Sequence, residues 1–250
     1  MPRLRNLTPG PPPDLVVRRL SRFAALNESE RALLRSITVV TRDVGPGQSL
    51  VAEGDRLDTP WLLLAGWACR MRGFPDGRRQ IFEFILPGEM YGLCLRPLAV
   101  SLSTIVTLTA ATISDAMPLR EVLLGRPQAY PNLAAALHCT AALDEAHLLN
   151  QLIRIGRQSA FERLAHLILE LRERLSMVGL AGADTIPLPL TQEMLADALG
   201  LSIVHLNRTL QQLRRENLIA FKSGVLRLIQ PDRLIEIADF RPPQVIKAAA

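Results

Sequence analysis

Cysteine is scarce in this sequence, which has three in 250 residues: Cys69, Cys94 and Cys139. Their number is odd, their spacing is wide and no CxxC pair occurs, so the chain carries neither a disulfide framework nor a zinc finger. This use of cysteine fits a reducing, cytoplasmic setting best.

Segments that would direct the chain to a membrane are missing too. The N-terminus, MPRLRNLTPGPPPD, lacks the apolar stretch of a signal peptide, and its prolines predict a disordered leader over residues 1–14. The longest uncharged stretch, residues 97–114, is interrupted by Ser and Thr, which favours buried strands over a membrane span. We therefore expect no membrane partner.

Signatures of catalysis are also absent. No GxSxG, P-loop, HExxH, paired-carboxylate or Cys-His motif occurs, and the four histidines are scattered. We therefore expect no enzyme, no catalytic residue and no metal site. The composition does provide apolar material for real cores, at 48% of residues, and a mild basic excess of +5 that permits nucleic-acid binding without arguing for it.

Short strands are predicted after two opening helices. Residues 15–23 have helical spacing of apolar side chains, and Asn27 with Glu30 makes a capping box for a second helix over residues 28–36. From residue 37 to residue 117, β-type runs alternate with glycine-containing turns, which is typical of an antiparallel barrel or jelly roll.

A long helix is predicted next. Residues 131–177 are rich in Ala, Leu, Arg and Glu, and Gly156 is the expected break between two helices. One stripe of the first helix is formed by Leu137, Ala141, Asp144, Leu148, Leu152 and Ile155. It predicts either packing on the chain's own barrel or a two-stranded coiled coil between subunits, which we favour because Asp144 fits poorly in an ordinary core.

The most informative segment is LTQEMLADALGLSIVHLNRTLQQLRREN, residues 190–217. Thr191 is an N-cap for a short helix, Gly200 permits a left-handed turn, and Ser202 caps a second helix over residues 203–216. Two helices joined by such a turn form a helix-turn-helix. Residues 218–229 alternate around Ser223-Gly224, which predicts a β-hairpin, or wing, with Lys222 near its tip.

The second helix of this segment exposes a face suited to a DNA major groove, since Leu206, Leu210 and Leu213 turn inward. Arg208 can bind guanine O6 and N7, Asn207 can pair with adenine, and Val204 can touch a thymine methyl. We predict DNA contacts by Thr191, Gln192, Ser202, Val204, His205, Asn207, Arg208, Arg214 and Lys222. The alternative is a helical hairpin for protein contact, in a sensory or interaction module that does not bind DNA.

The order of barrel, long helix and winged helix resembles the Crp-Fnr family of bacterial transcription factors, over residues 15–240. The most specific part is TQEMLADALGLSIVHLNRTLQQLRRENLI (191–219), which looks like the family's DNA-reading motif. GPGQSLVAEGD (45–55) and PDGRRQIFEFILPGEMYG (75–92) look like the two glycine-marked hairpins of the family's sensor barrel.

The resemblance implies an α+β fold. Its parts are an N-terminal jelly-roll barrel of the cyclic-nucleotide-binding type (15–126), a dimerisation helix (127–156), a C-terminal winged helix-turn-helix (157–240) and a tail (241–250). It implies a homodimeric, sequence-specific transcriptional regulator that binds a pseudopalindromic site in double-stranded DNA. RNA polymerase is then a candidate partner.

The effector pocket that the resemblance implies departs from the cyclic-nucleotide-binding members. Those members hold the ribose with a Gly-Glu pair and the cyclic phosphate with an Arg-Ser pair, and they contact adenine from the long helix. Here the corresponding, degenerate pocket is formed by Phe84, Gly92, Leu93, Cys94, Ser103, Thr104 and Leu148. A buried phosphate would lack its compensating charge, so cyclic AMP is disfavoured.

Other effectors stay open. No cysteine precedes Cys69, so the N-terminal cysteine cluster of the iron–sulfur members is absent. A haem stays open through His138, His147, Cys94 or Cys139 as axial ligand, although each is more often structural. An apolar small molecule, or no effector at all, is equally open, and we assign no cofactor.

Overall fold

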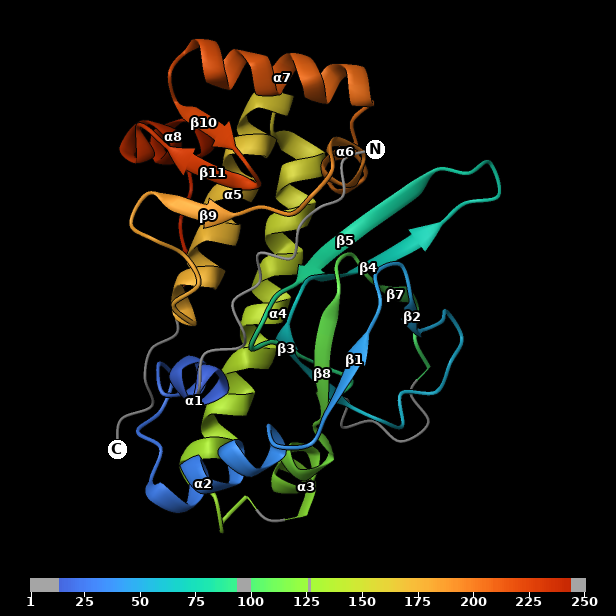
Figure 1. Ribbon diagram of the computed structural model, residues 1–250, viewed down its shortest axis with the longest axis vertical. Coiled ribbons are helices and arrows are strands. Elements are labelled where there is room, and N and C mark those ends of the chain that lie inside the picture. The colour runs from blue at the N-terminus through green and yellow to red at the C-terminus, as the bar shows by residue number, and fades with distance from the viewer. Residues whose placement is uncertain (1–13, 94–99, 126, 244–250) are drawn as a thin grey trace.

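The computed structural model describes residues 14–93, 100–125 and 127–243 of the chain (Figure 1). Most of the predicted leader, the end of the predicted tail and Cys94 lie outside these ranges. None of the helices within them is long and apolar enough to cross a membrane.

Two short helices open the described chain, α1 (Leu15–Leu20) and α2 (Glu28–Ile37). The capping box predicted at Asn27 is confirmed, because its side chain accepts a hydrogen bond from Glu30 N while Glu30 accepts one from Asn27 N. The other Glu30 oxygen accepts from Leu133 N at 2.9 Å. The cap therefore also holds α2 against the first turns of the long helix α4 (Pro131–Arg157).

The barrel consists of two four-stranded antiparallel sheets in the part of the chain that is described, with strand orders β1-β8-β3-β6 and β2-β7-β4-β5. The strands are β1 (Thr41–Val44), β2 (Ser49–Val51), β3 (Trp61–Ala65), β4 (Ala68–Gly73), β5 (Arg79–Ile85), β6 (Met90–Tyr91), β7 (Thr104–Thr107) and β8 (Ala111–Asp115). Gly66 between β3 and β4 has φ +83°, and a Cβ there would clash with the Ala110 carbonyl oxygen, so this tight corner requires glycine. Helix α3 (Met117–Gly125) follows the barrel.

Helix α4 continues through Gly156, so the predicted break lies later than expected. The backbone becomes extended at Gln158 and Ser159, and α5 (Ala160–Met177) begins there. Ser159 and Glu162 form a second capping box, in which Glu162 accepts from Ser159 N at 2.7 Å. The cap of the new helix, and not the glycine, therefore sets the boundary.

The faces of α4 differ from the predicted stripe. Leu137 is 2% exposed and packs in the core against α1, α2 and α3, so its assignment to a subunit interface is wrong. Asp144 lines a cavity beside the barrel. The exposed apolar surface lies on another side of α4, where Leu149 is 53%, Leu152 is 68% and Ile153 is 52% exposed. In the second half of the helix, the side that turns inward carries mainly polar residues. Those inward residues are Leu143, His147, Gln151 and Arg154.

The C-terminal unit is a winged helix. It contains β9 (Thr185–Pro187), α6 (Gln192–Leu199), α7 (Ile203–Arg215), β10 (Ile219–Lys222), β11 (Val225–Leu228) and α8 (Pro231–Ala238). The sheet order is β10-β11-β9, and β9 was not predicted, because the glycines and prolines around it are typical of a loop. Ile186 is buried and lies opposite Leu226, which draws this short segment into the sheet.

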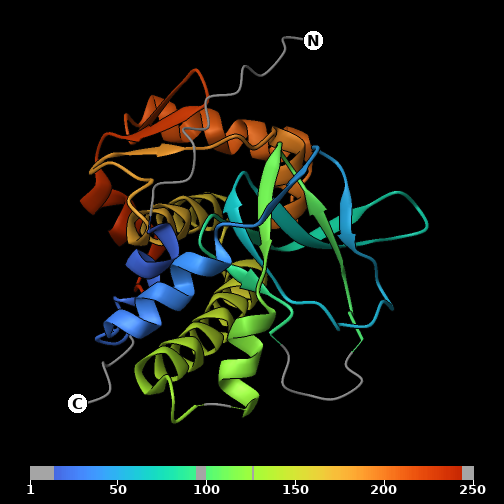
Figure 2. The same ribbon diagram turned by 60° about the horizontal axis from the view of Figure 1, so that its bottom comes forward.

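Helix α5 connects the winged helix to the rest of the molecule. The barrel lies on one side of α4 and α5 lies on the other (Figures 1 and 2). Buried side chains of α5, such as Leu164 and Leu171, belong to one apolar cluster with Trp67 and Phe84 of the barrel region and with the winged helix. The barrel and the winged helix therefore share a core.

Candidate nucleic-acid interface and the cavity beside the long helix

The predicted helix-turn-helix is present. Helix α6 begins after Thr191, whose hydroxyl accepts from Met194 N at 3.2 Å, and α7 begins after Ser202, whose hydroxyl accepts from His205 N at 3.2 Å. Gly200 ends α6 in the left-handed conformation, with φ 64°. Thr191, Gln192 and Ser202 are all exposed, so the two helix starts face solvent.

Helix α7 turns one side to the core and the other to solvent. Leu206, Leu210 and Leu213 are buried as predicted, together with Thr209, whose hydroxyl donates to the His205 carbonyl oxygen at 3.0 Å. Val204, His205, Arg208, Gln211 and Arg214 are exposed, as predicted. Asn207, predicted to be exposed, is half-buried, so its amide is only partly accessible.

Arg215 belongs to the same face, although the predicted contacts omit it. Val204, Asn207, Arg208, Gln211 and Arg215 line a shallow open hollow on α7. Positions 204, 208, 211 and 215 follow the helical period, and this spacing was the signal for Arg215 in the sequence.

The wing is the predicted hairpin. Lys222 lies opposite Val225, and Ser223 and Gly224 between them have φ 52° and 79°, as a two-residue hairpin turn requires. Lys222 is exposed beside this turn, and Arg227 is exposed on β11.

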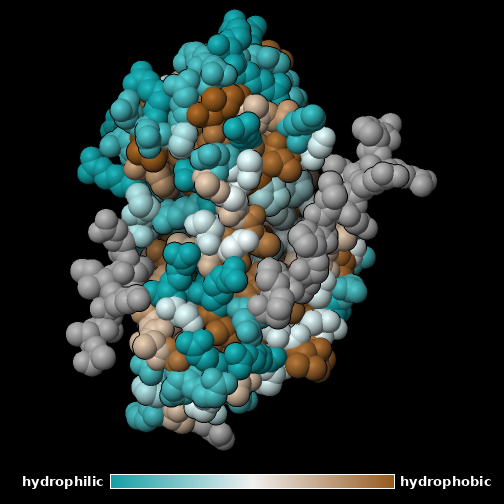
Figure 3. Space-filling model, turned by 60° about the vertical axis from the view of Figure 1, so that its left-hand side comes forward, coloured by the Kyte–Doolittle hydropathy of each residue, from teal (hydrophilic) through white to brown (hydrophobic). Residues whose placement is uncertain are grey.

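The surface formed by α7 and the wing is basic. Arg208, Arg214 and Arg215 are exposed, and none of them is within ion-pair distance of a described carboxylate. No Asp or Glu lies between Ser202 and Arg215. Figure 3 shows that the top of the molecule, where α7 lies, is mainly hydrophilic. Unpaired guanidinium groups on an exposed helix can bind phosphates and base edges.

A cavity of about 330 Å³ lies between the barrel and α4. Gly92 and Leu93 line it, as predicted for the effector pocket, and His138 lines it from α4. Of the other haem-ligand candidates, His147 is buried on α4 and Cys139 is half-buried beside the core of α1 to α4. The Cys94 assignment lies outside the described residues.

Four residues assigned to the pocket do not line this cavity. Phe84 is 2% exposed and packs against Trp67, because alternation along β5 turns it away from the cavity that its neighbour Glu83 faces. Ser103 is buried and bonded to Ser101, and Thr104 pairs with β4. Leu148 is half-buried on another side of α4. These four positions are corrections to the predicted pocket.

Charged groups line the cavity on both sides. They are the carboxylates of Glu83, Glu89 and Asp144 and the guanidinium groups of Arg19 and Arg70. Glu89 accepts hydrogen bonds from Arg174 at 2.6 Å and lies 3.3 Å from Arg19. Although burial disfavours its charge, these two arginines lower the pKa of Glu89 to about 2.

A buried ionic network extends from Glu89 to both long helices. Arg174 of α5 lies 3.4 Å from Glu170, and Glu170 lies 2.8 Å from Arg154 of α4. These side chains are all at most 8% exposed. The network was not predicted. Its one local signal in the sequence is the i, i+4 spacing of Glu170 and Arg174, which allows an ion pair within one helix.

The barrel also contacts the helix-turn-helix directly. Arg79 of β5 forms ion pairs with Glu193 at 2.7 Å and Asp197 at 2.9 Å, both on α6. Gln151 of α4 donates to the Ala198 carbonyl oxygen at 2.6 Å. The first helix of the motif is therefore fixed to both the barrel and α4.

Together these features define a winged helix-turn-helix protein with a jelly-roll barrel and a connecting long helix. Residues 162–237 match the Crp-like helix-turn-helix domain, and residues 41–115 match the cyclic nucleotide-binding domain. The chain belongs to the Crp-Fnr family of transcriptional regulators.

Named relatives agree with this assignment. The nitrogen fixation regulation protein FixK of Bradyrhizobium diazoefficiens is 31% identical over 90% of this chain and 92% of its own. The transcriptional activator protein FnrL of Cereibacter sphaeroides is 30% identical over 90% of each chain. The solved structure of FixK2 from Bradyrhizobium japonicum has a similar fold, with a TM-score of 0.68, 23% identity and coverage of 84% of this chain and 98% of that one.

Proposed function

We propose that this regulator is a homodimer that binds a pseudopalindromic DNA site with one α7 helix in each of two successive major grooves. The observation that carries the proposal is the exposed face of α7, where Arg208 and Arg215 lie in one open hollow without an ion-pair partner among the described residues. Arginines clustered on one helix face without neighbouring acids are typical of a surface that binds nucleic acid.

Each exposed group has a role that suits its chemistry. Arg208 binds guanine O6 and N7, Val204 contacts a thymine methyl, and Asn207 pairs with adenine through the accessible part of its amide. Thr191, Gln192 and Ser202 at the helix starts contact phosphates, as do Arg214, Arg215 and Lys222. His205 lies on the same exposed turn as Arg208.

The proposed dimer forms through α4. Its exposed Leu149, Leu152 and Ile153 repeat at helical spacing, which is the pattern of a two-stranded coiled coil. Binding to successive major grooves requires the two α7 helices of this dimer to lie about 34 Å apart. The proposed site of action is the cytoplasm, where bacterial DNA lies, and RNA polymerase is the proposed further partner.

We propose that the barrel does not take a cyclic nucleotide. The support is the charge of the cavity, where a phosphate would meet Glu83 and Asp144, while Arg19 lies 3.3 Å from Glu89 and Arg70 lies 3.8 Å from Glu83. A haem or another small molecule stays the alternative effector.

DNase footprinting of genomic fragments tests DNA binding. We expect protection of an inverted repeat with half-sites one helical turn apart, weakening steeply as salt rises because counterions are released from the DNA. The absence of a protected repeat on every fragment would favour the interaction module that does not bind DNA.

Light scattering tests the dimer seam. The double substitution Leu149→Asp with Leu152→Asp is expected to give monomers, because it places charges in the proposed apolar seam. Leu124→Asp is the control, since Leu124 is also exposed but lies on α3. A dimer that persists in the double variant contradicts the seam.

A further inference from the structure

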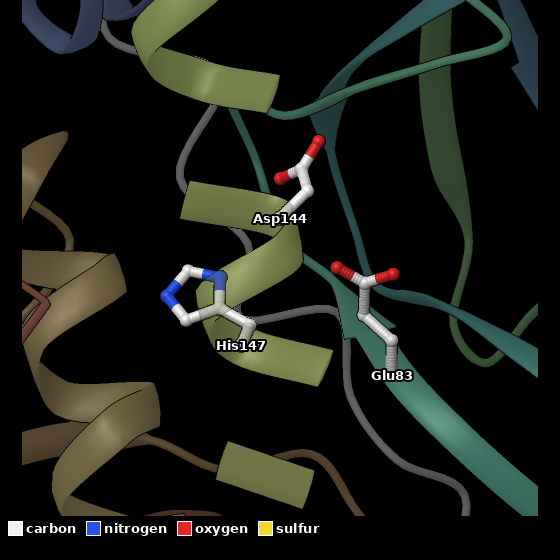
Figure 4. A group of neighbouring side chains, drawn as sticks. All are labelled: Glu83, Asp144 and His147. Carbon is white, nitrogen blue, oxygen red and sulfur yellow. The ribbon is translucent and has the colours of Figure 1, made fainter. Parts of the chain in front are cut away.

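Three side chains that can bind a metal ion converge between the barrel and α4. Glu83 lies on β5, and Asp144 and His147 lie one turn apart on α4 (Figure 4). One carboxylate oxygen from each acid and one ring nitrogen of His147 all lie within 4.8 Å of one another. Ligand atoms around a tetrahedral zinc ion are about 3.4 Å apart, so side-chain rotations that draw the three atoms together by about 1 Å close the site.

His147 gives an independent sign of a missing ligand. Its side chain belongs to a residue that is 5% exposed, and its Nδ1 atom has no hydrogen-bond partner among the residues that the structure describes. Figure 4 shows the ring nitrogen nearest the backbone facing the two carboxylates. Burial of the ring disfavours its charged form, and a neutral imidazole can offer a lone pair to a metal ion.

The two carboxylates lack close cationic partners. The nearest ion-pair contacts of Glu83 are long, 3.8 Å to Arg70 and 3.9 Å to Arg174. Asp144 forms no ion pair with any residue in the described ranges. The surrounding protein and the nearby carboxylates of Glu83 and Glu89 disfavour the charge of Asp144 and raise its pKa. A cation would relieve this repulsion.

We propose that Glu83, Asp144 and His147 bind a divalent transition-metal ion such as Fe²⁺, Co²⁺ or Zn²⁺. The two carboxylates balance its charge, and the imidazole ligand selects against Mg²⁺ and Ca²⁺, which prefer oxygen ligands. Three protein ligands leave coordination positions open, and Glu83 and Asp144 both face the cavity, so water or a small effector can occupy them.

The bound ion would join β5 of the barrel to α4. Because α4 also carries the proposed dimer seam, metal loading would fix the position of that seam relative to the barrel. This consequence for DNA binding rests on the proposed function, whereas metal binding itself does not.

Cobalt titration of the metal-stripped, full-length protein, followed by visible absorption, tests the site without DNA. We expect one Co²⁺ per chain, displaced by Zn²⁺ but not by an equal concentration of Mg²⁺ or Ca²⁺. Asp144→Asn and His147→Gln should each weaken Co²⁺ binding at least about tenfold. Glu145→Gln, which changes an acid on α4 outside the cluster, and His205→Gln, which changes an exposed histidine on α7, are the controls, and they should bind Co²⁺ as the parent protein does.

Several results would overturn the site. They are no Co²⁺ binding by the parent protein, equal binding in all four variants, or intense near-ultraviolet absorption of a thiolate ligand, which would indicate binding at a cysteine. Circular dichroism confirms that each variant is folded, and Glu83→Gln provides a third ligand variant if one of the others unfolds. Co²⁺ binding can be measured even if the footprint shows no DNA binding, and DNA binding can be measured even if Co²⁺ does not bind. The two experiments therefore test the two proposals separately.

Discussion

The molecule uses arginine in two opposite environments. On α7, Arg208, Arg214 and Arg215 are exposed and have no described ion-pair partner. Between the barrel, α4 and α5, the Arg154 and Arg174 side chains are 2 to 3% exposed and are paired with carboxylates at 2.6 to 3.4 Å. The first group has charge to offer to another molecule, and the charge of the second group is already neutralised.

This difference separates recognition from assembly. The α7 arginines can be replaced without disturbing any described carboxylate, so their effect should fall on DNA affinity. The buried arginines neutralise Glu89 and Glu170, so their effect should fall on folding. Substitutions in the two groups can confirm or break this division.

The largest effect is expected from Arg174→Met. This change keeps an apolar side chain but removes one guanidinium group from each acid, which leaves Glu89 with Arg19 at 3.3 Å and Glu170 with Arg154 at 2.8 Å. Loss of one partner of a buried pair costs up to about 3–5 kcal/mol. Urea unfolding measures the loss. Arg208→Met is the matched control, expected to stay within about 0.5 kcal/mol of the parent protein.

A double variant shows whether charge is the cause. Adding Glu89→Gln to Arg174→Met should recover part of the lost stability, because it removes the charge of a buried carboxylate that has lost its nearest guanidinium group. If Arg174→Met is as stable as Arg208→Met, the buried network does not hold the two parts together.

A pH-dependent effect is expected from Glu89. Its pKa is lowered from 4.5 to about 2 in the folded chain, so the folded state binds this proton less readily than the unfolded state. Its contribution, about 3 kcal/mol, is therefore complete above pH 4.5 and is lost as the pH falls towards 2. The stability difference between the parent protein and Glu89→Gln should narrow over this range. A difference that is constant with pH would contradict the pairing.

A smaller effect, confined to DNA, is expected from Arg208→Ala. Loss of a bidentate guanine contact costs about 1–3 kcal/mol of discrimination at one base position, which a selected-sequence binding assay measures. Lys222→Ala, at the wing, should instead weaken binding evenly across sequences and reduce its salt dependence. Unchanged base preference in Arg208→Ala would show that α7 is not the reading helix.

The winged helix was predictable because its signals are local. Thr191 and Ser202 cap helices, Gly200 makes the left-handed turn, and Leu206 and Leu210 mark the buried side of α7 within one helix. Each of these features depends on residues a few positions apart. The half-burial of Asn207 was missed, because it depends on neighbours that the helical period does not specify.

The cavity and the seam were not predictable in detail because their partners are distant in sequence. Leu137 has the same helical spacing as an interface residue, but α1 and α2 cover it. Asp144 faces Glu83, which is 61 positions away, and Glu89 pairs with Arg174, which is 85 positions away. Pairings of this kind depend on how the barrel docks on the helices, and the local pattern does not contain that information.

The core shared across α5 has a consequence for the cooperativity of unfolding. Trp67 and Phe84 on the barrel side and Leu164 and Leu171 on α5 belong to the same apolar cluster as the winged helix, so exposing one side exposes the other. The barrel and the winged helix should therefore melt in a single transition, as one folding unit.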